Sequence, residues 1–366
     1  MRVPQSSDTL RFNSDDSSDC TTQPPPVRLD RRVTRALLAL AAALALAACS
    51  PPSADNRSSG SPTFSADASP TLATTPTPTP TPTPSPTAST PQPEPSAETG
   101  QPTIKVVAVG DISCAPKDRD KYPCRDAETA ELAASLDPDL VLTLGDLQYE
   151  KGKYSDFLSS YDQSWGQLRE ITRPVIGNHE YDGPNADGYY KYFADQQPGP
   201  PGYYDFAAGS WRVFVLNSNC DKIDCASQLS WLRQRISSAE ARCSLVAWHH
   251  PVFNSGIHGS QESMLPAWRV AAEGGADVLL VGHEHAYERF APMDATGNIS
   301  PLGLTSFTVG TGGKNLYALK ARQSASRFWY NQGYGVLDLQ LKPRSLRWAY
   351  VTVAGKTLDS GTQKCR

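Results

Sequence analysis

Hydrophobic and polar positions divide the chain into two parts. Residues 1–100 contain one alanine and leucine run and otherwise few large apolar side chains, whereas the remainder carries short apolar runs separated by polar segments. Five of these runs are followed at once by polar residues, a pattern that predicts buried strands ending in functional loops. They cover residues 104–109, 140–144, 173–176, 245–248 and 278–281.

The segments between these runs favour helices, because their apolar residues recur at helical spacing. Alternating strands and helices predict α/β architecture. Residues 203–217 indicate instead a hairpin that turns at Gly209-Ser210, and residues 333–356 indicate further antiparallel strands. We therefore expect a two-sheet mixed β-sandwich flanked by helices, with the polar clusters converging where the strands end. The expected helices cover residues 126–136, 154–168, 226–236 and 262–272.

The N-terminal part has the pattern of a bacterial lipoprotein signal peptide at residues 28–49. Basic residues precede an uncharged run of 13 residues at 36–48, which ends in Leu46-Ala47-Ala48-Cys49. This run is too short to span a bilayer, so export and lipidation of Cys49 are expected, anchoring the protein to the outer face of the bacterial cytoplasmic membrane. An ordinary signal peptide cut nearby is the alternative. Residues 1–27 are either a mis-assigned start or an extension, and the sequence leaves both open.

Residues 50–100 form a Pro/Thr/Ser-rich segment with hardly any large apolar side chain. Such a segment is expected to be a disordered linker, extended at about 3.1 Å per residue, that separates the domain from the membrane. A recognition motif for a proline-binding module is the alternative. Residues 101–366 supply enough apolar and aromatic side chains for one large domain.

Charge and cysteine content narrow the class of protein. A net charge of −4 and a pI near 5.9 argue against a general nucleic-acid binder, which usually carries a basic excess. An even number of cysteines follows Cys49, as an oxidising compartment favours. Sequence proximity favours the pairs 114/124 and 220/225, leaving 243/365, although six cysteines allow 15 connectivities. A cysteine metal site is the rival interpretation, but no C-x-x-C spacing supports it.

All histidines of the chain fall in or just beyond the polar clusters. Histidines used for packing or surface polarity would be scattered, so this clustering favours a metal site. Carboxylates, an asparagine and a tyrosine at the same strand ends complete a mixed nitrogen and oxygen donor set suited to iron, zinc or manganese. The six histidines are His179, His249, His250, His258, His283 and His285.

These clusters, taken in order, resemble the five motifs of calcineurin-like metallophosphoesterases, and the resemblance covers residues 104–289. The tyrosine at 149 and the tail after the last motif are most similar to purple acid phosphatases. The motifs are Gly110-Asp111, Gly145-Asp146-Leu147-Gln148-Tyr149, Gly177-Asn178-His179-Glu180, Val246-Ala247-Trp248-His249 and Gly282-His283-Glu284-His285-Ala286-Tyr287-Glu288-Arg289.

The resemblance implies two metal ions and assigns their ligands. Asp146 would bridge the ions, since a carboxylate can span metals about 3.5–4 Å apart. Tyr149, as a phenolate, would favour Fe(III), and the second ion would be Fe, Zn or Mn. Many relatives have a histidine where this chain has Ser113, and Tyr149 compensates for it. The remaining ligands would be Asp111 and His285 at the Tyr149 ion, and Asn178, His249 and His283 at the other.

The resemblance also implies the reaction: attack of a metal-bound hydroxide on a small phosphate ester, most often a monoester. His179 would contact the phosphate, and His258 would assist the leaving group, although relatives often have a second histidine where this chain has Gly259. A phosphodiesterase or nucleotidase with the same centre is the alternative. A surface-anchored binding protein with structural metals is a more distant one. The oligomeric state stays undetermined.

Three further features invite a functional interpretation. His250 is expected to support the site rather than to bind a metal. The glycine-rich Gly310-Thr311-Gly312-Gly313-Lys314 lacks the full spacing of a phosphate-binding loop, so a tight turn near the rim is expected. Residues 181–204 are either a wall of the substrate site or an ordered surface loop.

Overall fold

The computed structural model describes residues 101–121 and 123–366, and the expectations for residues 1–27, 28–49 and 50–100 lie outside this range. The described residues lie within the range 101–366, where the sequence analysis predicts one large domain. None of its helices has the length and apolar character needed to cross a membrane.

The first sheet has six strands in the order β15-β14-β13-β1-β3-β5. Strands β1, β3 and β5 run parallel, while β13 pairs antiparallel with β1 and begins an antiparallel extension. The strands are β1 (Ile104–Val109), β3 (Leu140–Leu144), β5 (Thr172–Val175), β13 (Gly335–Lys342), β14 (Ser345–Thr352) and β15 (Thr357–Lys364).

The second sheet has seven strands in the order β12-β10-β11-β9-β8-β7-β6. Strands β7, β8, β9 and β11 are parallel, and the β6–β7 hairpin turns at the expected glycine and serine. The strands are β6 (Tyr204–Ala208), β7 (Trp211–Val215), β8 (Cys243–Ala247), β9 (Val278–Val281), β10 (Tyr287–Phe290), β11 (Thr305–Val309) and β12 (Ser326–Tyr330).

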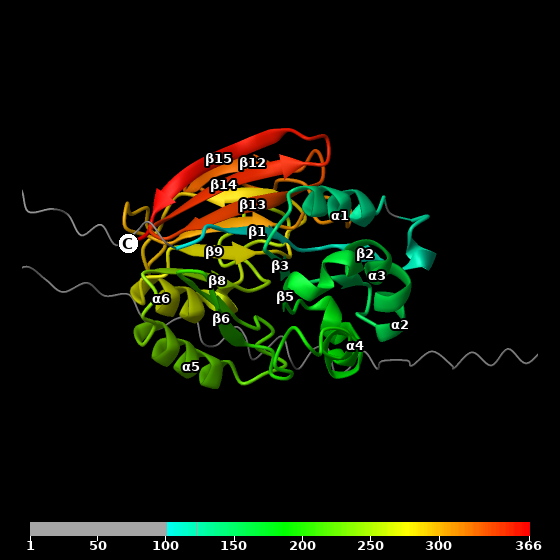
Figure 1. Cartoon of the computed structure of the whole chain (residues 1–366), viewed down its shortest axis with the longest axis horizontal. Helices are drawn as coiled ribbons and strands as arrows, with labels where there is room; N and C mark the ends of the chain where they lie inside the picture. The colour runs from blue at the N-terminus through cyan, green and yellow to red at the C-terminus, as the bar shows by residue number, and fades with distance from the viewer. Residues whose placement is uncertain (1–100, 122) are drawn as a thin grey trace, which may run out of the picture. The chain divides into compact units, whose positions relative to one another are not determined.

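The two sheets pack face to face around the main core, which confirms the expected sandwich (Figure 1). Strand β8 shows how alternation produces the layers, because successive side chains point to opposite faces. Leu245 and Ala247 lie between the sheets, whereas Val246 and Trp248 face the helices on the outer side. Those helices are α5 (Cys225–Ser237) and α6 (Leu265–Glu273), which close a second core.

On the first sheet, α1 (Asp126–Ser135) packs against β13. The single helix expected at 154–168 is wrong in detail, because the segment is broken into α2 (Tyr154–Asp156), the π-turn η2 (Phe157–Tyr161), α3 (Asp162–Ser164) and the 3₁₀ turn η3 (Trp165–Ile171). Phe157, Tyr161 and Trp165 are all fully buried, so packing of these aromatic rings overrides regular helix geometry here.

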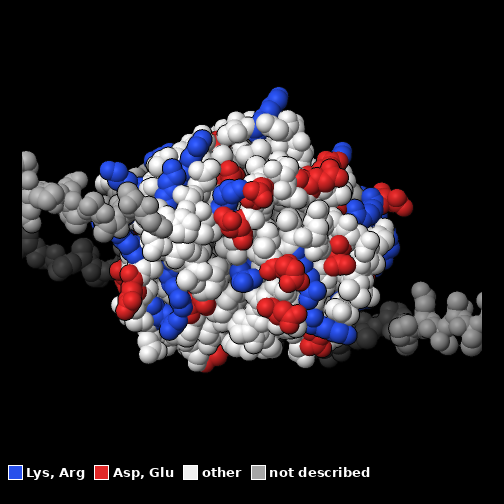
Figure 2. All heavy atoms as spheres, in the orientation of Figure 1, with Lys and Arg blue, Asp and Glu red and all other residues white. Residues whose placement is uncertain are grey.

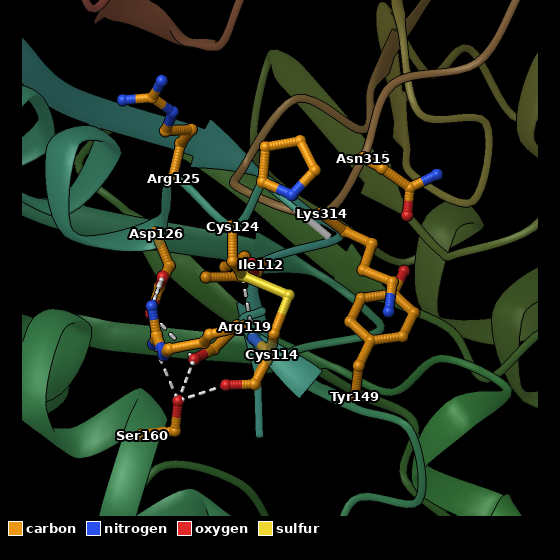
Figure 3. The surroundings of a disulfide bond; sticks show 12 residues. Ile112, Cys114, Arg119, Cys124, Arg125, Asp126, Tyr149, Ser160, Lys314 and Asn315 are labelled. Atoms are coloured by element: carbon orange, nitrogen blue, oxygen red, sulfur yellow. Dashed lines mark hydrogen bonds and ion pairs between the residues drawn. A yellow bond between two sulfur atoms is a disulfide. The ribbon is translucent and has the colours of Figure 1, made fainter. Parts of the chain in front are cut away.

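Three disulfides join Cys114–Cys124, Cys220–Cys225 and Cys243–Cys365, which are the two pairs that sequence proximity favoured and the pair that remained. The first closes the loop between β1 and α1 (Figure 3). The last joins strand β8 of the second sheet to the residue that follows β15 of the first sheet. It therefore ties the two layers of the sandwich together covalently.

Candidate metal centre and active site

The polar clusters meet where parallel strands of both sheets end. Asp111 follows β1, Asp146 follows β3, and Asn178 follows β5 in the first sheet. His249 and His283 follow β8 and β9 in the second sheet. The sandwich thus directs the carboxyl ends of these strands to one rim, as the alternation of elements predicted.

Tyr149 lies at the centre of one half of this cluster. It belongs to β4 (Gln148–Tyr149), a two-residue strand paired with β2 (Ser113–Cys114). Its hydroxyl lies 2.9 Å from Asp111 Oδ1, 2.9 Å from His285 Nε2 and 3.2 Å from Asp146 Oδ2. We call Asp111, Tyr149 and His285 the tyrosine half.

His249 lies at the centre of the other half. Its Nε2 atom is 3.2 Å from Asp146 Oδ2 and 3.2 Å from Asn178 Oδ1. The His283 ring lies 5.1 Å from the His249 ring, measured between centroids. We call Asn178, His249 and His283 the asparagine half. Asp146 Oδ2 contacts both halves, which is the position that a bridging ligand requires.

The backbone is strained at three of these residues. Asp111, Asp146 and His283 have φ angles of 62°, 51° and 69°, in the left-handed region that side chains other than glycine rarely adopt. Strain of this kind persists where surrounding contacts hold it, and it concentrates at functional sites. The ligands are therefore held in place by the fold rather than by local preference.

Glycines are required beside two ligands because the chains approach closely. A Cβ atom at Gly177 would lie 2.2 Å from Asp146 Oδ1, and one at Gly145 would lie 2.4 Å from His249 Nδ1. Gly145 also has a φ of 88°. Any side chain at either position would displace a proposed ligand.

The imidazoles are oriented by backbone carbonyls. His249 Nδ1–H donates to the Leu144 carbonyl at 2.7 Å, and His285 Nδ1–H donates to the Asn315 carbonyl at 2.6 Å. Each bond fixes the tautomer and leaves Nε2 directed into the cluster. Metal-binding histidines are commonly oriented in this way.

The donor set fits metal ions. Ligand atoms of Asp111, Asp146 and His249 lie within 4.8 Å of one another, and those of His249, His250 and His283 form a second such group. Asp111 and Asp146 are almost fully buried, which is costly for carboxylates unless cations or hydrogen bonds compensate. A third group, Cys243, Asp277 and Cys365, does not qualify because its cysteines form a disulfide.

The pKa shifts in the metal-free site also indicate a site for cations. Burial opposes a charge on His249, yet the neighbouring Asp146 carboxylate raises the pKa of His249 to about 9. Burial and the Asp111 and Asp146 carboxylates raise the pKa of Tyr149 far above its usual value. A phenolate at Tyr149 therefore needs a strong cation beside it, as the expected Fe(III) would provide.

Lys314 is a functional candidate that the sequence did not reveal. Its side chain is 4% exposed, and Nζ lies 4.5 Å from the centroid of the Tyr149 ring (Figure 3). Nζ also forms an ion pair with the Glu150 carboxylate. The glycine-rich segment that ends at Lys314 bends at the rim. The Lys314 side chain covers one face of the Tyr149 ring.

Ser113 takes no part in the cluster. Its hydroxyl donates to Asp126 Oδ2 at 2.8 Å, and the same carboxylate pairs with Arg119 (Figure 3). Ser160 joins this network by accepting from Arg119 at 2.9 Å. The serine that replaces a relative's histidine is thus part of the support for α1.

His179 lies beside the cluster rather than inside it. Its Nδ1–H donates to the Glu150 carbonyl at 2.7 Å, and Nε2 is 4.0 Å from Asp146 Oδ2. One quarter of the side chain is exposed to solvent. Burial disfavours its charge, but Asp146 and the Glu150 carbonyl outweigh burial and raise the pKa of His179. This position suits contact with a substrate.

His258 packs against His283 of the asparagine half. Its ring centroid is 4.5 Å from that of His283, and its Nδ1 atom is 3.4 Å from Glu284 Oε2. The side chain is 34% exposed, so a bound molecule can reach it.

Two buried glutamates, for which the sequence suggested no role, organise these loops. Glu180 accepts hydrogen bonds from the backbone N–H groups of Gly177 at 2.8 Å, Leu147 at 2.8 Å and Asp146 at 3.0 Å. Glu284 accepts from the His258 N–H at 3.1 Å and from Asn254 Nδ2 at 2.6 Å. Both follow a motif histidine directly, which was the available signal.

His250 lies at the rim, where it is hydrogen-bonded to Ser218. The Ser218 hydroxyl accepts from the His250 N–H at 3.1 Å and lies 2.7 Å from its Nδ1 atom. Burial and the neighbouring His249 lower the pKa of His250 to about 3, so the ring is neutral at ordinary pH. His250 and Asn178 line a cavity of about 370 Å³, which Tyr181 also borders.

Comparison with known proteins agrees with this geometry. The model of the family described as calcineurin-like phosphoesterase matches residues 104–287. Purple acid phosphatase 17 of Arabidopsis thaliana is 23% identical, with 63% of this chain and 76% of that protein covered. Tartrate-resistant acid phosphatase type 5 of Mus musculus is 24% identical, with 70% and 89% covered.

A solved structure of a purple acid phosphatase from yellow lupin (Lupinus luteus) seeds superposes with a TM-score of 0.60 at 21% identity. The match covers 73% of this chain but only 55% of the lupin chain. At this identity the likeness supports the fold, which is that of a sandwich with helices outside.

Proposed function

The chain belongs to the calcineurin-like phosphoesterase family, and from that membership we propose that it is an extracytoplasmic phosphomonoesterase with two metal ions. The observation that carries the proposal is the shared position of Asp146. Its Oδ2 atom lies 3.2 Å from the Tyr149 hydroxyl and 3.2 Å from His249 Nε2. One carboxylate oxygen thus serves both halves of a buried donor set.

The residues present would hold one ion at each half and share Asp146 between them. Fe(III) suits the tyrosine half, and Fe, Zn or Mn suits the asparagine half. Ions bound there would acidify a water molecule and neutralise phosphate charge. In the overall reaction the water oxygen forms a bond to phosphorus, the bond from phosphorus to the alcohol oxygen breaks, and the released alcohol gains a proton.

His179 and His258 supply the side chains that contact the substrate. Protonated His179, oriented by the Glu150 carbonyl, donates Nε2–H to a phosphate oxygen as negative charge develops there. His258 Nδ1 lies 3.4 Å from Glu284 Oε2, so the carboxylate orients the ring. Its Nε2 is the atom that can give a proton to the leaving alcohol oxygen.

A substrate panel combined with metal analysis tests the proposal. Purified protein containing about two metal equivalents should hydrolyse 4-nitrophenyl phosphate with a higher kcat/KM than bis(4-nitrophenyl) phosphate. A reversed preference would favour the phosphodiesterase alternative. Full metal occupancy without hydrolysis of either ester would favour a binding protein whose metals serve structure.

We also propose attachment to the outer face of the cytoplasmic membrane through lipidated Cys49. The support is the lipobox at residues 46–49 and the proline-rich segment that separates it from the domain. Cys49→Ser should move the protein from the detergent phase to the aqueous phase. Unchanged partitioning of the variant would exclude this anchor.

A further inference from the structure

One hollow adjoins the asparagine half of the cluster, and a second shares two lining residues with the first. The first is the cavity of about 370 Å³ that Asn178 and His250 border. The second has a volume of about 530 Å³ and lies farther along the same wall. Tyr181 and Lys222 line both, so the hollows meet at these two residues. We call them the polar hollow and the tyrosine groove.

The lining of the polar hollow suits hydroxyl groups. Besides the two residues of the cluster rim, it presents hydroxyl, amide and carboxylate side chains, which can donate to or accept from an alcohol. Asp182 Oδ2 lies 3.2 Å from His179 Nδ1, so one wall is continuous with the substrate-facing histidine. The polar lining residues include Asp182, Ser218, Asn219, Asp221, Gln261 and Ser263.

The tyrosine groove offers aromatic surface instead. Tyr181, Tyr190 and Tyr203 line it together with Pro200 and Pro201, and all three tyrosines are half-buried. The Tyr181 and Tyr190 hydroxyls lie 3.2 Å apart. The Tyr203 ring is supported from behind by another aromatic ring.

Contacts around the groove hold these rings in place. The Tyr203 and Trp231 ring centroids are 5.0 Å apart, and Asn217 Nδ2 donates to the Tyr181 hydroxyl at 2.9 Å. Gly202 has a φ of 84°, and a Cβ atom there would lie 2.8 Å from the Tyr190 hydroxyl. A preformed wall of rigid aromatic rings is typical of a small-molecule site.

We propose that the two hollows form the leaving-group site of the enzyme. The order along the wall is metal ligands, then polar side chains, then tyrosine rings. A phosphate ester that matches this order has an alcohol with a hydroxylated part next to the phosphate and a flat aromatic ring beyond it, as in a nucleoside monophosphate. This inference rests on the proposed phosphoesterase function and names the substrate class of the same site.

The order of polar and aromatic side chains along the wall also predicts which phosphate esters the enzyme prefers. A phosphate ester of a small polyol can fill the polar hollow but leaves the groove empty. An ester that also carries an aromatic ring gains contact with Tyr190 and Tyr203. Stacking of a base on an aromatic side chain contributes about 1–3 kcal/mol, so removing one ring should reduce kcat/KM by about 5- to 150-fold for the aromatic ester alone.

The test compares adenosine 5′-monophosphate with glycerol 3-phosphate in the metal-loaded protein. Wild type should favour the adenosine ester. Tyr203→Ala should lower kcat/KM for that ester by about 5- to 150-fold, mostly through KM, and change the value for glycerol 3-phosphate less than about twofold. Tyr203→Phe keeps the ring and should behave as wild type. Tyr190→Ala repeats the test if Tyr203→Ala does not fold.

Tyr334→Ala is the matched control, since Tyr334 is also half-buried but lies outside both hollows. This variant should leave kcat/KM unchanged for both substrates. If the tyrosine variants lower kcat/KM equally for both substrates, or if wild type shows no preference between them, the leaving-group assignment is wrong while the phosphatase proposal stands. If neither ester is hydrolysed by metal-loaded wild type, the proposed function itself fails.

Discussion

The two halves of the metal cluster differ in how the fold encloses them. In the tyrosine half, Asp111, Tyr149 and His285 are at most 2% exposed. Tyr317 stacks on His285 at 4.0 Å between ring centroids, and Lys314 covers Tyr149.

In the asparagine half, by contrast, Asn178 and His283 are only partly buried, and Asn178 borders a cavity. His250 and His258 lie next to this half without belonging to it, whereas the His179 ring lies 4.5 Å from the Tyr149 ring and 4.0 Å separates His179 Nε2 from the shared Asp146.

This difference suggests a division of labour. An ion in the tyrosine half is surrounded by packed side chains and can leave only if part of the fold opens. An ion in the asparagine half faces the region where substrate enters. One half therefore resembles a structural site built into the core, and the other combines metal binding with substrate contact. The experiments below test this contrast, beginning with the residue that the two halves share.

Asp146→Asn should have the largest effect, because it weakens both halves at once. Amide substitution removes the negative charge that would bridge the ions, so both metals and activity should be lost together. Metal stoichiometry measured by elemental analysis, alongside kcat, checks this. If Asp146→Asn kept two metals per chain, Asp146 would not be the shared ligand.

Chelation should separate the halves. A mild chelator should remove one equivalent from the exposed asparagine half quickly and abolish activity, while the ion of the tyrosine half leaves slowly. Removal should be faster at pH 5 than at pH 8, because protons compete for His249, whose pKa in the metal-free site is raised to about 9.

Tyr149→Phe is the control for this experiment. It removes a ligand from the enclosed half, so both equivalents should then leave quickly. Loss of the two ions at one rate from the unmodified protein would contradict the contrast between the halves.

His179→Ala should have a smaller effect that is confined to catalysis. His179 lies outside the ligand set, so both metals should remain bound. Loss of a donor that acts in the transition state typically costs about 10²–10³ in turnover, or about 3–4 kcal/mol. Measurement of kcat and metal content in the same preparation separates the two effects. If the metals were lost as completely as in Asp146→Asn, His179 would be a ligand.

Glu284→Gln should have the smallest effect, on the loop that carries His258. Burial would raise the pKa of Glu284, but hydrogen bonds from His258 and Asn254 outweigh it and lower the pKa below the ordinary 4.5. The ionised form therefore stabilises the protein above pH 4.5, and this contribution is lost as the pH falls through the lowered pKa.

The variant should accordingly be less stable than wild type at pH 7 by about 1–3 kcal/mol, and the difference should shrink toward pH 3. Urea unfolding at both pH values measures it. Glu262→Gln, at an exposed glutamate, serves as the control. An equal loss of stability at both pH values would contradict the role assigned to the charge of Glu284.

The contrast between the halves also shows what the sequence can predict. Proposed ligands such as Asp111 and Asn178 closely follow apolar runs, so the parallel strands bring them to one rim and their convergence could be expected. Lys314 and Tyr317 cover the tyrosine half from a loop whose glycine-rich segment predicted a turn near the rim but not a contact with Tyr149 or His285. Their placement depends on tertiary packing, which local spacing does not encode.

Secondary structure shows the same limit. Strands β1, β3 and β9 begin and end where their apolar runs do. Strand β15 (Thr357–Lys364) was not predicted, because its side chains are mostly polar and partly exposed at the sheet edge. It forms through backbone pairing with β14 rather than through an apolar pattern of its own.

On the face shown in Figure 2, acidic and basic side chains are interspersed over the surface. Selection among phosphate esters is therefore more readily explained by the shape and polarity of the hollows than by a broad electrostatic field on that face. Specificity is therefore expected to depend on the few residues that line the hollows beside the asparagine half.

The disulfide between Cys243 and Cys365 spans 122 positions of sequence and closes a covalent ring. Five of the chain's six histidines lie within the ring, namely His249, His250, His258, His283 and His285. A protease that cuts once inside it, for instance near the exposed Leu302, opens the ring without dividing the molecule. The nicked protein would migrate as one species in non-reducing electrophoresis and as two after reduction, with every imidazole still attached to the same covalent body until a reductant is added.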